Sequence, residues 1–193
     1  MRCKKVKTTA KNAEYLWFIG IKRGNDIVTN NTKGMTVVER EIVNLDIEFK
    51  VNASVEKVFE AWTNPNVFKQ WLFTTKETNK VAQNQFEING EWEIVDERGG
   101  KTYRATGTYM DIVKPYKLMY SFKMPQFSYL EDIITVEFID LENETQVKFN
   151  QGLKVPLDDT FNKQSYEQSK EDAKKQTEEG YNKMFEQLKQ ILE

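Results

Sequence analysis

The chain has 193 residues, with 28 basic against 30 acidic residues, one cysteine and no histidine. The absence of histidine excludes a Ser-His-Asp triad, a Cys-His pair and every histidine-containing zinc or iron site. A single cysteine excludes an intramolecular disulfide and a zinc site built from thiolates. Any acid–base chemistry would fall to aspartate, glutamate, lysine or tyrosine, whose pKa values approach neutrality only through burial or neighbouring groups.

The length fits one domain with a full hydrophobic core. Phe, Tyr and Trp together make up 12% of the chain, which predicts a core or cavity lined with rings. No apolar run approaches the roughly 20 residues of a membrane span, so we expect a soluble, cytoplasmic protein. The net charge of -2 gives no overall electrostatic reason to bind nucleic acid or an anionic membrane.

Charge is spread unevenly along the chain. Residues 1–34 carry eight basic and two acidic residues, a net charge of +6, and the remainder is therefore -8. Because a polar loop-like stretch precedes Met35, we divide the chain into a basic extension, residues 1–34, and a domain, residues 35–193. We favour an accessory or poorly ordered extension, whose aromatic run 15–21 could add an edge strand, over a signal peptide or a nucleic-acid-binding arm.

The domain begins with a strand and two short helices. Apolar and polar residues alternate over residues 43–51, which predicts a half-buried strand. Ser54 is a suitable helix N-cap, and the apolar residues after it have the helical spacing i, i+3, i+4 and i+7. Asn64 and Pro65 end this helix and begin another. The second helix is expected to carry Val67, Phe68 and Trp71.

The middle of the chain has the pattern of an antiparallel meander. Ring-bearing and β-branched residues alternate with polar ones, and turn sequences at 89–90, 97–100, 115 and 142–144 separate the segments. The first of these strands is expected to contain Val81, Phe86 and Ile88. The residues expected to share one face of the later strands are Trp92, Ile94, Tyr103, Ala105, Gly107, Tyr109, Leu118, Tyr120, Phe122, Ile134, Val136, Phe138, Val147 and Phe149.

The chain ends in an amphipathic helix. We expect it to be firm from about Thr177, whereas the polar residues 165–178 are either its solvated first half or a flexible lead-in. Its apolar stripe consists of Tyr181, Met184, Phe185, Leu188, Ile191 and Leu192.

This order of elements indicates an α+β domain in which a curved antiparallel sheet of about seven strands wraps around the long C-terminal helix. Residues 51–65, with Phe68 and Trp71 shortly after, resemble the opening signature of the activator of Hsp90 ATPase homologue (AHSA1-like) family. That family belongs to the START-like, or SRPBCC, superfamily of helix-grip proteins. Later matches are Gly90-Glu91-Trp92, Gly107-Thr108-Tyr109, Pro115 to Tyr120, and Glu179-Gly180-Tyr181.

The resemblance covers about Val43 to Leu192 and implies a cavity between helix and sheet, of the kind that the superfamily uses for lipids, sterols and polyketides. For each candidate lining residue, solid core packing is the competing interpretation. Tyr109 and Tyr120 are the best candidates for orienting a ligand, because a buried phenol seeks a hydrogen-bond partner. The candidate lining residues are Trp71, Trp92, Tyr109, Leu118, Tyr120, Phe122, Val136, Phe138, Phe149, Met184, Phe185 and Leu188.

The predicted function is therefore to bind an apolar or aromatic small molecule, without a metal, a cofactor or catalytic residues. This prediction calls for a pocket of roughly 300 Å³ or more. One alternative is a cyclase- or aromatase-type enzyme, but the strand carboxylates Glu91, Glu93 and Glu137 alternate toward solvent. Another is a co-chaperone-like interaction module in the stress response. An Hsp90-type partner is disfavoured because residues 1–34 are too short for the extra domain of full-length members. We expect a monomer or a weak homodimer.

Overall fold

A computed structural model gives the fold of residues 42–128, 130–155 and 163–193. The basic extension, with its aromatic run at 15–21, lies outside these described residues. The elements are β1 (Ile42–Val51), α1 (Val55–Thr63), α2 (Pro65–Phe68), β2 (Asn79–Asn84), β3 (Glu91–Arg98), β4 (Lys101–Val113), β5 (Lys117–Phe122), β6 (Asp132–Asp140), β7 (Thr145–Lys154) and α3 (Lys163–Leu192).

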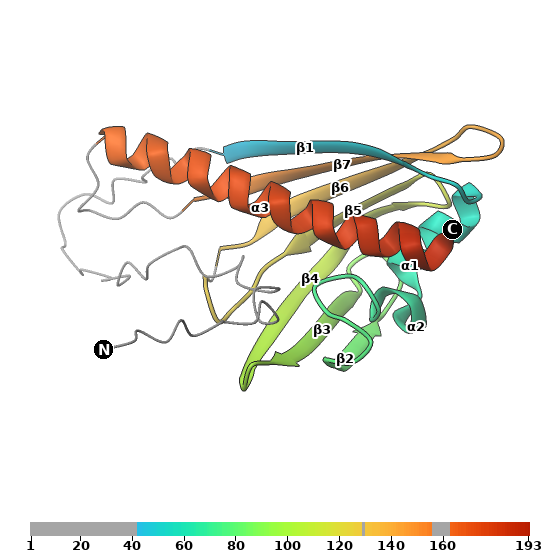
Figure 1. The fold of residues 1–193 in the computed structure, drawn as a ribbon, viewed down its shortest axis with the longest axis horizontal. Helices are drawn as coiled ribbons and strands as arrows, with labels where there is room; N and C mark the ends of the chain where they lie inside the picture. Colours follow the sequence, from blue (N-terminus) through green and yellow to red (C-terminus); the bar gives the residue numbers. More distant parts are fainter. Residues whose placement is uncertain (1–41, 129, 156–162) are drawn as a thin grey trace, which may run out of the picture.

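The seven strands form one antiparallel sheet in the order β1-β7-β6-β5-β4-β3-β2. Strands β2 to β7 follow each other as hairpins, and β1 joins the far edge by pairing with β7. Figure 1 shows α3 lying across one face of the curved sheet, with α1 and α2 grouped at the end where the chain terminates. The predicted α+β helix-grip fold is confirmed.

The residues predicted to share one face of the later strands are buried, as strand alternation indicated. Trp92 pairs with Gly107 across β3 and β4, and Ile94 pairs with Ala105. Gly107 is required at its position: a Cβ there would lie 1.7 Å from the Ser121 carbonyl oxygen and 2.6 Å from the Trp92 Nε1. The glycine therefore lets the Trp92 indole lie directly over the backbone of β4.

The start of the domain follows the predicted capping pattern, with one difference. The Ser54 side chain accepts a hydrogen bond from the Lys57 amide at the start of α1, and Asn64 caps α2 by accepting from the Asn66 amide at 2.9 Å. Helix α2 ends at Phe68, so Trp71 lies beyond it rather than within it. After Phe68 the chain continues as turns, with the Trp71 and Leu72 amides donating to the Phe68 carbonyl, and Phe73 then has a left-handed φ of 56°.

Two other boundaries differ from the sequence-based expectation. Strand β2 ends at Asn84, so Phe86 and Ile88 lie in the loop before β3. Helix α3 begins at Lys163, well before Thr177, and the buried residues of its apolar stripe lie from Gly180 onward. The polar stretch is therefore the solvated first half of the helix, and the alternative of a flexible lead-in is wrong. In the described ranges, no helix is both long and apolar enough to cross a bilayer.

Candidate functional site

A small cavity lies in the core between the sheet, α1 and the segment that follows α2. Its volume is about 10 Å³, which is room for a single water molecule. The interior is therefore nearly closed, and this cavity does not have the roughly 300 Å³ that the sequence-based expectation required. The lining consists of Trp62, Phe68, Leu72, Trp92, Ile94, Tyr109 and Tyr120.

Three of the twelve candidate residues, Trp92, Tyr109 and Tyr120, line this cavity. The other nine are buried in the hydrophobic core around it. Those nine are Trp71, Leu118, Phe122, Val136, Phe138, Phe149, Met184, Phe185 and Leu188.

Four lining residues had not been named as site residues: Trp62, Phe68, Leu72 and Ile94. Helical spacing already placed Trp62 and Phe68 on apolar faces, and strand parity placed Ile94 inside. Leu72 gave no such signal, because it follows the last turn of α2 in a stretch with no periodic pattern.

The rings around the cavity are held by edge-to-face contacts. Trp92 and Tyr120 lie 5.8 Å apart between ring centroids at 88°, and Trp62 and Trp71 lie 4.6 Å apart at 69°. Such arrangements are favourable for aromatic pairs. The Trp71 indole also donates a hydrogen bond to the Ala61 carbonyl at 3.1 Å, so this ring is fixed at both its face and its polar edge.

Polar atoms of the cavity-lining rings are left without hydrogen bonds. The Nε1 atoms of Trp62 and Trp92 and the hydroxyl of Tyr120 are buried and find no partner among the described residues. An unmade hydrogen bond at a buried polar group costs about 1–3 kcal/mol. Tyr109 differs, because its hydroxyl accepts a hydrogen bond from the Asn84 side chain at 3.1 Å. Three donors on cavity-lining rings are thus without an acceptor.

Burial further favours the protonated form of the two cavity phenols. It raises the pKa of Tyr109 to about 12, against the opposing effect of the Asn84 hydrogen bond. Burial also raises the pKa of Tyr120, and Tyr109, when ionised, raises it further. The nearby Trp62 indole lowers the pKa of Tyr120, although its Nε1 and the phenol oxygen do not meet in hydrogen-bond geometry. At neutral pH both phenols are therefore neutral O–H groups.

A second polar cluster lies on the inner face of β6 and β7. Asp132 accepts hydrogen bonds from the Gln151 side chain at 2.8 Å and from the Lys154 amide at 2.9 Å. Burial raises the pKa of Asp132, and these hydrogen bonds and the charge of Lys154 partly oppose that rise. The Gln151 Oε1 and the Tyr181 hydroxyl are buried without a partner in the described part of the chain.

Sequence reasoning missed this cluster, although parity could have found it. Asp132 lies two residues before Ile134, and Gln151 lies two residues after Phe149, so both continue inward-facing series. In contrast, the carboxylates expected to face solvent do so: Glu91 and Glu137 are exposed, and half-buried Glu93 forms an ion pair with Arg104. No cluster of three or more potential metal ligands occurs within the residues that the structure describes.

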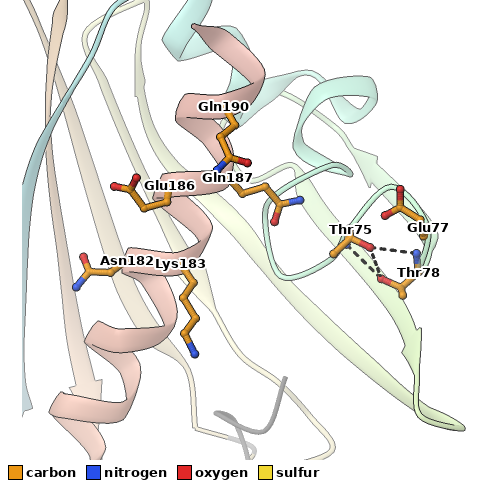
Figure 2. Close-up of a pocket in the computed structure, with 8 residues that line it drawn as sticks. All are labelled: Thr75, Glu77, Thr78, Asn182, Lys183, Glu186, Gln187 and Gln190. Carbon is orange, nitrogen blue, oxygen red and sulfur yellow. Dashed lines mark hydrogen bonds between the residues drawn. The ribbon is translucent and has the colours of Figure 1, made fainter. Parts of the chain in front are cut away.

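A polar groove of about 740 Å³ lies on the surface between α3 and the loop after α2 (Figure 2). On the loop side, the hydroxyls of Thr75 and Thr78 lie 3.0 Å apart and share a hydrogen bond. On the helix side the groove is lined by Asn182, Lys183, Glu186, Gln187 and Gln190.

Two contacts tie this face of α3 to the segment that closes the cavity. The Gln187 side chain donates a hydrogen bond to the Gln70 carbonyl, and the Phe73 amide donates to the Met184 sulfur at 3.1 Å. Leu72, which lies between the two tethered residues, lines the cavity. We call residues 68–73 the wall segment, because they separate the cavity from the helix face that forms the groove.

The description "Activator of Hsp90 ATPase homolog 1-like protein" belongs to the family model that matches residues 52–193. The chain belongs to this family. The AHSA1-like match covers both short helices, strands β2 to β7 and α3, and it confirms the resemblance seen in the sequence. No curated protein matches the chain.

Solved structures share the AHSA1-like fold. Protein SA2116 of Staphylococcus aureus, described as a protein of unknown function, is 31% identical; the match covers 80% of this chain and 96% of that one, with a TM-score of 0.75. Protein NE0264 of Nitrosomonas europaea is 17% identical over 78% of this chain and 94% of its own, with a TM-score of 0.62. The similarity to NE0264 shows the fold alone.

Proposed function

We propose that this AHSA1-like domain is a cytoplasmic protein that binds a small apolar or aromatic molecule in its interior, in an enlarged form of the cavity between the sheet, α1 and the segment after α2. The observation that carries the proposal is the set of buried, unpartnered polar atoms on Trp62, Trp92 and Tyr120. A core selected only for stability would gain from satisfying or removing these groups, because each costs free energy as it stands. A bound molecule would supply the missing partner.

Binding requires the cavity to expand. Its volume of about 10 Å³ is far below the roughly 300 Å³ of an ordinary ligand pocket. The wall segment is the part best suited to move, because α2 is only four residues long and Phe73 holds a left-handed φ of 56°. That conformation is strained for a bulky residue and is retained through surrounding contacts. An outward shift of Leu72 would enlarge the cavity toward the groove.

The proposed binding residues are those at the closed cavity, together with core residues that a larger cavity would expose. Trp92, Tyr109 and Tyr120 belong to the first group. The cavity-lining side chains in the described ranges include no carboxylate and no lysine, so holding a ligand is favoured over cyclase-type acid–base catalysis. The residues proposed for the enlarged cavity are Trp71, Leu118, Phe122, Val136, Phe138, Phe149, Met184, Phe185 and Leu188.

Native mass spectrometry of the full chain purified from its own cells tests the proposal. We expect an added mass that is lost on denaturation. In Leu72→Phe, a larger side chain at the cavity wall should reduce the bound fraction. Leu153→Phe, a matched change of a buried residue near the far end of β7, should keep it. Identical native and denatured masses for the unaltered protein would contradict ligand binding.

A further inference from the structure

We infer that the cavity recognises a neutral carbonyl oxygen of its ligand through three hydrogen-bond donors, the indoles of Trp62 and Trp92 and the hydroxyl of Tyr120. This inference rests on the proposed function and names the chemical group that the site selects. The compounds it fits are apolar or aromatic ketones, aldehydes or esters.

The three donor residues come from different elements and line one cavity. Trp62 lies on α1, Trp92 on β3 and Tyr120 on β5, and all three line the same cavity. Two of the donors belong to rings in edge-to-face contact, with centroids 5.8 Å apart. All three polar atoms are buried and lack a partner among the described residues. Convergence from three elements distinguishes this arrangement from a single misplaced side chain.

The donors are also held in place before any ligand arrives. Gly107 leaves room for the Trp92 indole, and Trp62 packs at 69° against Trp71. The Trp71 indole provides an internal comparison, because it is equally buried and yet donates to the Ala61 carbonyl. The indole of Trp71, which does not line the cavity, is therefore satisfied, whereas the indoles of the two cavity-lining tryptophans are not. Such preorganisation lowers the cost of binding.

The chemistry of the lining selects a neutral acceptor. An indole N–H can only donate, and the Tyr109 oxygen already accepts from Asn84. A ligand amine or ammonium could donate to the Tyr120 oxygen, but it would leave both indole N–H groups without an acceptor. A carboxylate would be buried without a cation, because the lining side chains in the described part of the chain are all uncharged, and such burial is costly. A carbonyl oxygen, with two lone pairs and no charge, fits these donors.

Two probes of nearly the same shape test the inference on the full chain: acetophenone, which has a carbonyl, and ethylbenzene, which lacks one. The readout is the set of indole N–H signals in ¹H–¹⁵N spectra, assigned with single Trp→Phe variants. We expect acetophenone to move the Trp62 and Trp92 signals downfield, as hydrogen bonding does, and ethylbenzene to leave them without this displacement. The Trp71 signal should report no new hydrogen bond with either probe, because its donor is already used.

Affinity measurements separate the donor role from general packing. Tyr120→Phe should weaken acetophenone binding about three- to tenfold, the value of one hydrogen bond, and leave ethylbenzene binding unchanged. Tyr103→Phe removes a hydroxyl from a buried ring outside the cavity lining and should change neither affinity.

The outcomes distinguish the two proposals. If both probes bind equally well, and neither the indole signals nor Tyr120→Phe depends on the carbonyl, the carbonyl site is refuted and ligand binding stands. The three donors would then bind only a water molecule. If neither probe binds at millimolar concentration and no mass co-purifies with the protein, both the carbonyl site and the proposed function are refuted.

Discussion

Gly107 shows how one residue positions the donors of the cavity. With no side chain, it leaves room for the carbonyl of Ser121 and the indole of Trp92, both of which lie close to the position that a Cβ would occupy. Any Cβ at this position would meet backbone as well as a ring, and the backbone of a paired strand has little freedom to retreat. The location of the Trp92 donor therefore depends on the absence of a side chain on the neighbouring strand.

Gly107→Ala should consequently be strongly destabilising. The added Cβ would lie 1.7 Å from the Ser121 oxygen, and we expect a loss of about 3 kcal/mol in the free energy of unfolding. Urea denaturation gives this value directly. Gly152→Ala is the matched control, because its Cβ would first meet the side-chain Cγ2 of Ile42 at 3.0 Å, which can move. A loss in Gly107→Ala no larger than in the control would show that β4 and β5 can separate without cost.

Asp132 makes stability depend on pH. Burial raises its pKa above the ordinary value of 3.8, so the folded state binds the proton more tightly than the unfolded state. The stability that Asp132 contributes is therefore complete below about pH 3.8 and declines as pH rises through the raised pKa. Asp132→Asn should gain stability relative to the unaltered protein over this range, as measured by urea denaturation from acidic to neutral pH. Parallel stability profiles would refute this assignment.

At the scale of elements, periodic segments were predictable and aperiodic ones were not. The alternation in β1 and the i, i+4 spacing in α1 determined both the type and the buried face of these elements. The wall segment has no period. Its course depends on the left-handed Phe73 and on contacts with α3, a helix about one hundred residues away in the sequence. The cavity-lining role of Leu72 therefore could not be obtained from local pattern.

The tether between α3 and the wall segment should control access to the cavity. Removing the Gln187 side chain in Gln187→Ala deletes its hydrogen bond to the Gln70 carbonyl, and we expect faster association and dissociation of acetophenone in NMR exchange measurements. Gln190→Ala changes the same face of the helix and should leave both rates unaltered. Equal rates in the two variants would place the access route elsewhere.

At the scale of the whole molecule, we predict that residues 1–34 are dispensable to the fold of the domain. The family match begins at residue 52 and the first strand at Ile42. A chain that starts at Met35 should therefore unfold at the same midpoint temperature as the full chain, as measured by calorimetry. A lower midpoint would show that the basic extension packs against the domain and contributes to its stability.

The sheet order has a consequence for how this protein is made. Among the described residues, β1 is the first strand and its partner β7 is the last, with residues Ile42 and Lys154 facing each other across the pair. Because synthesis proceeds from the N-terminus, β1 leaves the ribosome long before β7 is made, so it cannot pair until nearly the whole domain has been synthesised. Such a strand is exposed to other chains in the meantime. Strand β1 is therefore the strand of this sheet that stays unpaired longest during synthesis.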